Sequence, residues 1–409
     1  MDELPIGRRV AYWRTRRRLS QQVFADRLGK SKSWVDKVER GVRRLDKFSV
    51  IYEIADLLQI DVQLLLGREP DRRPGGPACL DQVEVTEIRS ALERYDQIST
   101  FFHAPPQPPS IDELRKAVQH AWLSYQHAKY GPLARVLPKL LRDAQAADTA
   151  CASGEASLLA AHLLGQVYQI ASSCLRKLGE LELAWLAADR SIAVALRAGD
   201  QLLAGTASYR VGSALLALGR ARPALEVNVN IANRLAPGDA CRATPEHFSV
   251  YGMLLLQGAM AAARIGDGAT VRDLLTAADA AARAVGGSHN YYWTSFSPTN
   301  VDLHRAAAMV ELGEGGLAVQ THEHLDRASF AAMLPERRAH HYVDLARGLA
   351  QVGDIERASE MLLEGDRLAP SEIRCRPVAH EVLSDVLRRT KGSPSAPVAE
   401  LAETMGVGV

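Results

Sequence analysis

Residues 19–41 read LSQQVFADRLGKSKSWVDKVERG, two short segments with helical spacing of apolar residues. Ser20 and Ser31 each precede one of these segments, at the position where an N-cap residue is expected. Gly29 and Gly41 follow the segments, and glycine readily takes the left-handed conformation that ends a helix. The stretch therefore predicts two short helices joined by a tight turn, as in a helix-turn-helix motif.

The motif lies within residues 5–66, which we expect to form about five short helices. Small Ala25 sits where the two helices of the motif would approach each other closely. Apolar side chains at helical spacing are expected to face a common core. These are Ile6, Val10, Trp13, Val23, Phe24, Leu28, Val35 and Val38.

Basic residues are concentrated in this part of the chain. The whole chain of 409 residues has a formal net charge of +1, with 49 Lys or Arg and 48 Asp or Glu. Residues 1–70 carry +5 and the remainder carries −4. Such a basic head is typical of proteins that contact nucleic acid, although a solvated basic face is the alternative.

The pattern over about residues 5–67 resembles the phage-repressor (Xre-type) helix-turn-helix family. Phe24 stands where that family usually has Leu. The resemblance implies a lambda-repressor-like, five-helix domain over residues 1–67 that binds double-stranded operator DNA, usually as a homodimer on two half-sites. The matching positions are Leu19, Gln21, Ala25, Leu28, Gly29, Ser31, Val35, Glu39 and Gly41.

A helix that enters the major groove reads base edges with its N-terminal residues. Trp34 is a candidate for such a contact, with packing against a neighbouring helix as the alternative. Glu39 is expected to pair with an Arg, because a carboxylate facing phosphate would repel it. The candidate DNA-binding residues are Gln21, Ser31, Lys32, Ser33, Trp34, Lys37, Arg43 and Arg44.

Proline and glycine divide the rest of the chain. Residues 67–79 contain three of each, which predicts a linker at 68–80. The stretch HAPPQPPS at 103–110 interrupts an irregular helical region expected over 81–150. No segment shows the alternation of a strand set, so the fold class is all-α. Residues 391–409 are expected to form a flexible tail.

An apolar–Gly pair recurs from residue 178 onward, with spacings of 40, 47, 47 and 40. Five residues after each glycine comes Ala or Val, and seven before it comes a small residue, so paired helices can touch closely. Stacked helix pairs of this kind share one core. The glycines are Gly179, Gly219, Gly266, Gly313 and Gly353.

This repeat resembles the tetratricopeptide (TPR) family, although its spacing exceeds that family's roughly 34 residues. We therefore expect a TPR-like α-solenoid over 151–390, closed by one capping helix at 371–390. Its concave face would bind a peptide, small-molecule or protein ligand. The candidate groove residues are Gln166, Gln169, Tyr209, Arg210, Gln257, Asn300, His304, His340, Asp344 and Arg347.

One segment of the repeats is rich in aromatic residues. Tyr291, Tyr292, Trp293 and Phe296 fall within six positions, in a chain with only 6% aromatic residues. The segment is either a mobile lid over the groove or a plug that fills a gap between repeats, and the plug is slightly favoured.

Nothing in the sequence names a reaction. The motifs HExxH, GxSxG and GxxxxGK[ST] are absent, so neither an enzyme nor a cofactor or metal site is expected. The five cysteines are far apart and form no CxxC pair, which predicts no disulfide framework. No run of about 18 apolar residues and no apolar signal core are present, so we expect no membrane association and a cytoplasmic protein.

The combination resembles actinobacterial regulators with an Xre-type head and a TPR-like body. We therefore expect a sequence-specific DNA-binding transcriptional regulator. Its body would mediate dimerisation, sense a peptide or small-molecule signal, or both. The alternative is a protein-interaction adaptor that uses the solenoid groove, with DNA binding secondary.

Overall fold

The computed structural model describes residues 6–16, 19–43, 45, 50–51, 54, 57–58, 82–93, 108–151, 153–238, 243–286 and 289–408. The chain divides into two compact units, residues 1–75 and 76–409, and each is described by itself. All regular secondary structure in the described residues is helical, which confirms the all-α fold class. The expected linker at 68–80 lies outside the described residues.

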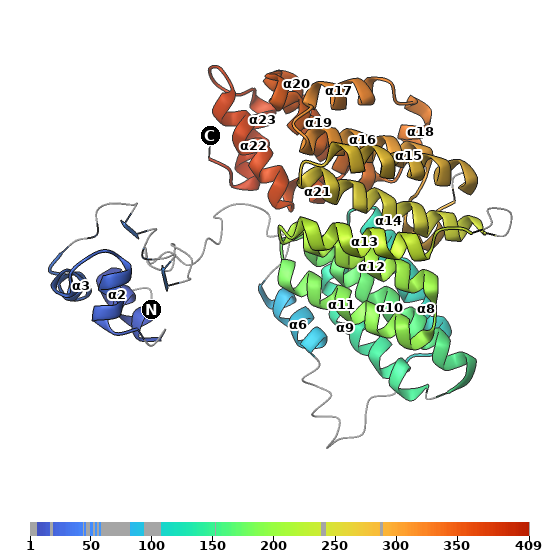
Figure 1. Ribbon diagram of the computed structural model, residues 1–409, viewed down its shortest axis with the longest axis horizontal. Helices are drawn as coiled ribbons and strands as arrows, with labels where there is room; N and C mark the ends of the chain where they lie inside the picture. The colour runs from blue at the N-terminus through green and yellow to red at the C-terminus, as the bar shows by residue number, and fades with distance from the viewer. Residues whose placement is uncertain are drawn as a thin grey trace. The chain divides into compact units, whose positions relative to one another are not determined.

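The first unit, which we call the head, begins with α1 (Ile6–Arg16), α2 (Gln21–Arg27) and α3 (Lys32–Glu39) (Figure 1). Ser20 Oγ accepts a hydrogen bond from the Val23 amide at 3.2 Å, and Ser31 Oγ accepts one from the Trp34 amide at 3.1 Å. Gly29 and Gly41 have φ of 62° and 75°. The predicted caps and terminators of the helix-turn-helix are therefore confirmed. The last two expected helices lie mostly outside the described residues.

The core of the head contains Phe24 and Ala25 from α2 and Val35 from α3, all fully buried. The expectation for Val23 was wrong: its side chain is 41% exposed. Phe24 and Ala25 take the core-facing positions of this turn of α2, so Val23, about 100° away around the helix from Phe24, faces solvent. At Gly7, an added Cβ would lie 1.9 Å from the Val38 carbonyl oxygen, so α1 approaches α3 with backbone in direct contact.

The second unit opens with three helices. They are α6 (Gln82–Glu93), α8 (Ile111–Gln126) and α9 (Tyr130–Ala150). A capping box starts α8, in which Ser110 and Glu113 satisfy each other's backbone amides. The apolar faces of α6, α8 and α9 share a core with the first helices of the repeats.

Helix pairs follow, and their boundaries match the predicted repeat. Each pair turns at one of the five predicted glycines, whose φ values lie between 74° and 87°. We call residues 154–368 the repeat region. Its pairs are α10 (Gly154–Lys177) with α11 (Leu181–Ala198), α12 (Gln201–Ala217) with α13 (Ala221–Arg234), α14 (Pro245–Arg264) with α15 (Gly268–Val285), α16 (Pro298–Glu311) with α17 (Gly315–Glu323), and α19 (Pro335–Val352) with α20 (Ile355–Leu368).

Small residues allow the paired helices to touch. The residue five positions after each turn glycine is completely buried: Ala184, Ala224, Val271, Ala318 and Ala358. At Gly212, seven residues before Gly219, an added Cβ would lie 2.0 Å from Asn228 Nδ2 on the neighbouring helix α13. The predicted close contact between paired helices is therefore present. The short helix α18 (Arg327–Ala332) extends the loop between α17 and α19.

The C-terminal end differs from expectation. The single capping helix expected at 371–390 is two helices, α21 (Pro370–Arg374) and α22 (Pro377–Arg389), because proline disfavours helical backbone at the residue before it. The tail expected to be flexible contains α23 (Ala396–Met405). Its residues Leu401 and Met405 are at most 3% exposed and pack in a core with α20 and α22, so apolar spacing outweighs the preceding Gly–Ser–Pro segment.

The last helices return to the first repeat. Lys177 Nζ, at the end of α10, lies 2.6 Å from Glu336 Oε1 in α19 and 2.5 Å from Glu372 Oε1 in α21. At Gly179, an added Cβ would lie 3.2 Å from Pro377 Cγ in α22. Because both ends of the repeat region meet here, the first helices of the pairs surround a common space.

Two other expectations need correction. Helix α10 is long and apolar enough to cross a membrane by length and composition, contrary to expectation, but 78% of its most apolar window is buried inside the protein. It is therefore packed as a core helix. Cys151 and Cys174 are free thiols, whereas Cys375 is disulfide-bonded, which the cysteine spacing did not predict.

Candidate functional sites

Helix α3 presents a polar surface to solvent. Lys32, Ser33 and Lys37 are exposed, and so is Arg43 just beyond the helix. Trp34 is half-buried against the core of the head, so the structure places it in packing, although part of the ring remains accessible. The guanidinium carbon of Arg43 lies 5.9 Å from the centre of the Trp34 ring. Arg44 lies outside the described residues.

A partly buried ion pair joins α1 to α3 in the head. Arg14 Nε lies 2.5 Å from Glu39 Oε1, and Arg14 Nη2 donates to Glu39 Oε2 at 3.0 Å. Gln21 Nε2 donates to the same carboxylate at 2.8 Å. Glu39 therefore pairs with an arginine as expected. Because the Gln21 side-chain NH₂ group donates to Glu39 inside the head, its amide oxygen is the group that remains for a contact with DNA.

These contacts fix α3 on α1 and α2 and leave one face of α3 free. The major groove admits an α-helix, and lysine and serine side chains can reach base edges and phosphate oxygens. The free face of α3 exposes Lys32, Ser33 and Lys37.

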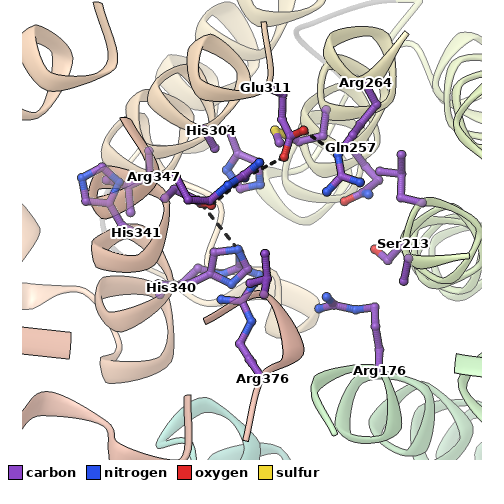
Figure 2. Close-up of a pocket in the computed structure, with 18 of the residues that line it drawn as sticks. Arg176, Ser213, Gln257, Arg264, His304, Glu311, His340, His341, Arg347 and Arg376 are labelled. Atoms are coloured by element: carbon purple, nitrogen blue, oxygen red, sulfur yellow. Dashed lines mark hydrogen bonds and ion pairs between the residues drawn. The ribbon is translucent and has the colours of Figure 1, made fainter. Parts of the chain in front are cut away.

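The repeat region surrounds a cavity of about 420 Å³ (Figure 2). Its walls are formed by the first helices of the five pairs, α10, α12, α14, α16 and α19, and by the start of α22. The structure brings together seven of the ten predicted groove residues on these walls. They are Tyr209, Gln257, Asn300, His304, His340, Asp344 and Arg347.

The other three predicted residues do not line this cavity. Gln166 Oε1 accepts hydrogen bonds from Trp122 Nε1 at 2.9 Å and Trp293 Nε1 at 3.2 Å. Gln169 Nε2 donates to Thr206 Oγ1 at 3.0 Å. Arg210 is 4% exposed, with its guanidinium carbon 4.5 Å from the centre of the Tyr209 ring. Helical position predicted these three residues for the groove, but their side chains contact neighbouring helices instead, Arg210 through the Trp122 ring of α8 at 5.2 Å.

Several charged residues of the cavity were not predicted. Arg176 and Arg264 lie in the last turns of α10 and α14, three and two residues before the turn glycines Gly179 and Gly266. A basic residue this close to a turn glycine is the local signal that points to them. Glu311 Oε2 lies 2.7 Å from Arg264 Nε, and Glu311 Oε1 accepts from Arg347 Nη1 at 2.8 Å. The acidic side of the cavity is thus neutralised by its own arginines (Figure 2).

The cavity histidines are held neutral. Burial lowers the pKa of His304 to about 4, with a further contribution from the nearby Arg337. Burial also lowers the pKa of His340 well below its usual value, and Arg376 and Lys177 act in the same direction. At neutral pH these imidazoles therefore contribute hydrogen-bonding groups and no charge to the wall.

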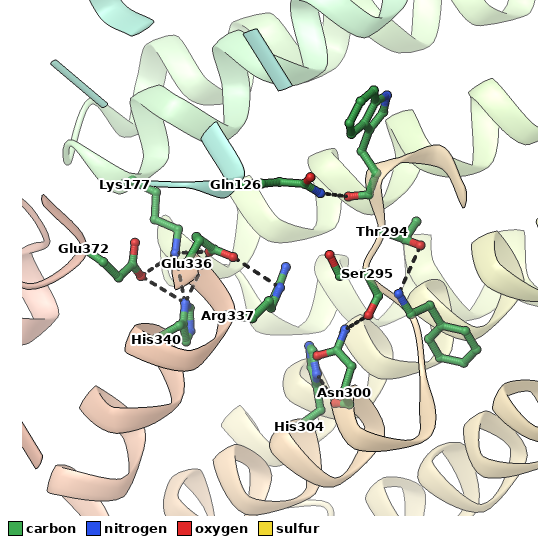
Figure 3. A network of polar contacts seen from close by, with 12 residues as sticks. Gln126, Lys177, Thr294, Ser295, Asn300, His304, Glu336, Arg337, His340 and Glu372 are labelled. Atoms are coloured by element: carbon green, nitrogen blue, oxygen red, sulfur yellow. Dashed lines mark hydrogen bonds and ion pairs between the residues drawn. The ribbon is translucent and has the colours of Figure 1, made fainter. Parts of the chain in front are cut away.

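A buried ionic network lies beside the cavity (Figure 3). Glu336, His340 and Glu372 bring their ligand atoms within 4.8 Å of one another, which is the spacing of a metal site. Lys177 Nζ, however, lies 2.6 Å from Glu336, 2.5 Å from Glu372 and 2.9 Å from His340 Nδ1. The ammonium group thus occupies the position that a metal ion would take. Tyr130 donates a further hydrogen bond to Glu372 at 2.5 Å.

The aromatic segment packs between helices. Phe296 is 1% exposed and lies against Gly252 of α14, where an added Cβ would be 1.9 Å from the ring. The Trp293 ring stacks on Trp122 with centroids 5.8 Å apart. The Gln126 Nε2 group donates a hydrogen bond to the Trp293 carbonyl at 3.3 Å, and Figure 3 marks this bond at Gln126. These contacts join α8 to α14, which is the arrangement of a plug.

Comparison with known proteins identifies one domain. Residues 5–66 match the family model of a helix-turn-helix domain, so the chain contains a helix-turn-helix domain at its N-terminal end. No curated protein and no solved structure matches the chain. The domain indicates a DNA-binding regulator of transcription rather than an enzyme.

Proposed function

We propose that this protein is a sequence-specific transcriptional regulator whose head binds an operator and whose repeat region senses a signal molecule in its central cavity. The observation that carries the proposal is the exposed face of α3, where Lys32, Ser33 and Lys37 project from a helix-turn-helix domain. The basic charge of residues 1–70 supports it, because lysine and arginine attract the phosphate backbone.

We further propose an Xre-type head, a TPR-like body and a homodimer that works in the cytoplasm. The match of residues 19–41 to the Xre-type pattern and the positive-φ glycines between paired helices support the first two assignments. Helix-turn-helix domains commonly bind as dimers to half-sites about one helical turn apart, which supports the third. A ligand that changes the curvature of the repeat region would change the spacing of the two heads.

The test is binding of the full chain to a DNA fragment from the promoter of its own gene, as a function of salt concentration. Lys32→Ala and Lys37→Ala are each expected to reduce the slope of log affinity against log salt by about 1. Lys139→Ala is the matched control, because Lys139 is exposed and lies in the second unit. Unchanged slopes in both head variants would contradict DNA contact through α3.

The alternative is an adaptor that grips a protein partner through the repeat region. The clustering of exposed cations on α3 favours the regulator. Absence of any specific DNA site at physiological salt, together with a partner captured by the repeat region, would favour the adaptor.

A further inference from the structure

One end of the cavity holds arginine without a matching carboxylate. Arg176 lines the cavity from the end of α10, and it forms no hydrogen bond or ion pair with any residue that the structure describes. In Figure 2 its guanidinium points into the pocket, toward the side of Arg376. Arg337 lies nearby on α19, 3.3 Å from Glu336 Oε2, but that carboxylate is shared with Lys177.

Unsatisfied polar groups continue behind this wall. Arg210 packs on the ring of Tyr209, which lines the cavity, and Arg210 Nε is buried without a hydrogen-bond partner. The Tyr125 hydroxyl is also buried without a partner. Buried polar groups in folded proteins are normally hydrogen-bonded. Arg210 does not line the cavity, so its contribution is a positive charge directly behind Tyr209.

The cations around Tyr209 make this end of the cavity positive. Burial by itself raises the pKa of a tyrosine, but the positive charges of Arg210, Arg337 and Arg176 outweigh burial and lower the pKa of Tyr209 to about 8. Cations that stabilise a buried phenolate would equally stabilise a ligand anion at the same place.

We propose that Arg176 and Arg337, with the Tyr209 hydroxyl, form an anion subsite that binds the carboxylate or phosphate group of a small ligand with an apolar body. The apolar body would lie against the aliphatic wall of the cavity, formed by Leu216, Met260, Leu303 and Ala307. This inference rests on the proposed role of the cavity as a signal-binding site.

Size and access fit such a ligand. A volume of about 420 Å³ lies within the range of small-molecule sites, roughly 300–1,000 Å³. Pro377 and Glu381 line one edge of the cavity and are exposed, so the cavity opens to solvent beside α22. At the opposite wall Glu311 is paired with Arg264 and Arg347, which leaves the end near Arg176 as the attractive one for an anion.

The experiment follows tyrosine ionisation in the full chain by ultraviolet absorbance, with and without three probes. Hexanoate and hexyl phosphate carry the proposed anions on the same apolar chain, and hexanamide is the neutral control. In the wild-type protein a bound anion should raise the pKa of Tyr209, and Tyr209→Phe should remove that titration step. The two anions together distinguish a carboxylate ligand from a phosphate ligand.

Arg176→Gln is expected to weaken the response to the anions by roughly tenfold or more, since charge-assisted hydrogen bonds are lost. Arg272→Gln, at an exposed position of α15, is the matched control and should respond as wild type does. Arg176→Lys keeps the positive charge and should retain part of the response to the anions. This variant therefore separates the loss of charge from any effect of Arg176→Gln on the fold.

Three results would overturn the proposal: no response to either anion, an equal response to hexanamide, or an unchanged response in Arg176→Gln. The readout does not involve DNA. Failure of the subsite therefore leaves DNA binding by the head standing, and loss of operator binding leaves the subsite standing.

Discussion

At the scale of single residues, buried carboxylates hold helices together within each of the two units. Glu39 holds α1, α2 and α3 through Arg14 and Gln21. Lys177 joins the start of the repeat region to its end through Glu336 and Glu372. A buried charge that loses its partner is costly, so these positions should be far more sensitive than ion pairs on the surface.

Glu39→Ala should destabilise the head by about 3 kcal/mol, because Arg14 would be left partly buried without its partner. Hydrogen exchange of the backbone amides in α2 and α3 of the full chain measures this loss. Asp36→Ala is the matched control on the same helix, since its pair with Arg40 is exposed. Equal loss of protection in both variants would show that the buried pair does not position α3.

Lys177→Met should lower the free energy of unfolding of the second unit by about 3 kcal/mol, because Glu336 and Glu372 would each lose a buried cation and keep only Arg337 and Arg376 as partners. Thermal unfolding of the full chain measures the effect. Lys139→Met removes an exposed ammonium that pairs with Asp143, and we expect a change of at most about 1 kcal/mol there. Similar melting temperatures for both variants would contradict the structural role of Lys177.

At the scale of elements, small residues decide how closely helices and segments approach. The turn glycines and the buried alanines set the distance within each pair, and Gly252 receives the ring of Phe296 from the aromatic segment. The segment therefore acts as part of the core between α8 and α14, and its removal should loosen both helices.

Gly252→Ala should destabilise the second unit by about 1–3 kcal/mol, because the new methyl group overlaps the Phe296 ring. Gly258→Ala in the same helix is the control. Its nearest neighbours, Leu274 Cδ1 and Val229 Cγ2, would lie at 3.3 and 3.4 Å, and alanine favours helix. Chemical denaturation measures the free energy of unfolding of Gly252→Ala and Gly258→Ala. The double change Gly252→Ala with Phe296→Leu should recover part of the stability that Gly252→Ala loses. Stability unaffected by Gly252→Ala would contradict the plug.

At the scale of the whole molecule, buried histidines make the second unit sensitive to acid. His341 is 2% exposed, and its Nε2 lies 3.0 Å from His322 Nδ1. Burial, with a smaller contribution from His322, lowers the pKa of His341 to about 3. The unfolded chain, with a histidine pKa of about 6.5, takes up the proton first as pH falls. The contribution of the neutral, buried His341 to the free energy of unfolding is therefore complete above about pH 6.5 and decreases as the pH falls below it.

Between pH 7 and pH 5, His341 alone should lower the free energy of unfolding of the second unit by about 2 kcal/mol. Unfolding by urea at both pH values measures it, and His341→Gln should lose correspondingly less stability over that interval. His127→Gln, at an exposed position of the loop after α8, should keep the wild-type dependence. The same pH dependence in His341→Gln and the wild type would contradict the neutral, buried state of His341.

Much of this architecture could be predicted because it depends on local signals. Ser20, Ser31 and the turn glycines act within a few residues, so capping rules located the helices and the repeat. The curvature of the repeats depends on packing between distant helices, so the sequence did not show that Lys177 meets Glu372, 195 residues away. Which side chains meet in the cavity depends on the same packing, so Arg176 and Arg264 were missed and Gln166 was placed in the groove although it contacts Trp122.

The most direct test of the central claim is genome-wide mapping of DNA bound by the full chain in cells. The proposed regulator predicts enrichment of one sequence motif with two half-sites separated by about one helical turn, roughly 10 base pairs. The double change Lys32→Ala with Lys37→Ala should abolish this enrichment, and Lys139→Ala should preserve it. Absence of a shared motif, or the same enriched sites in the double variant, would contradict the account.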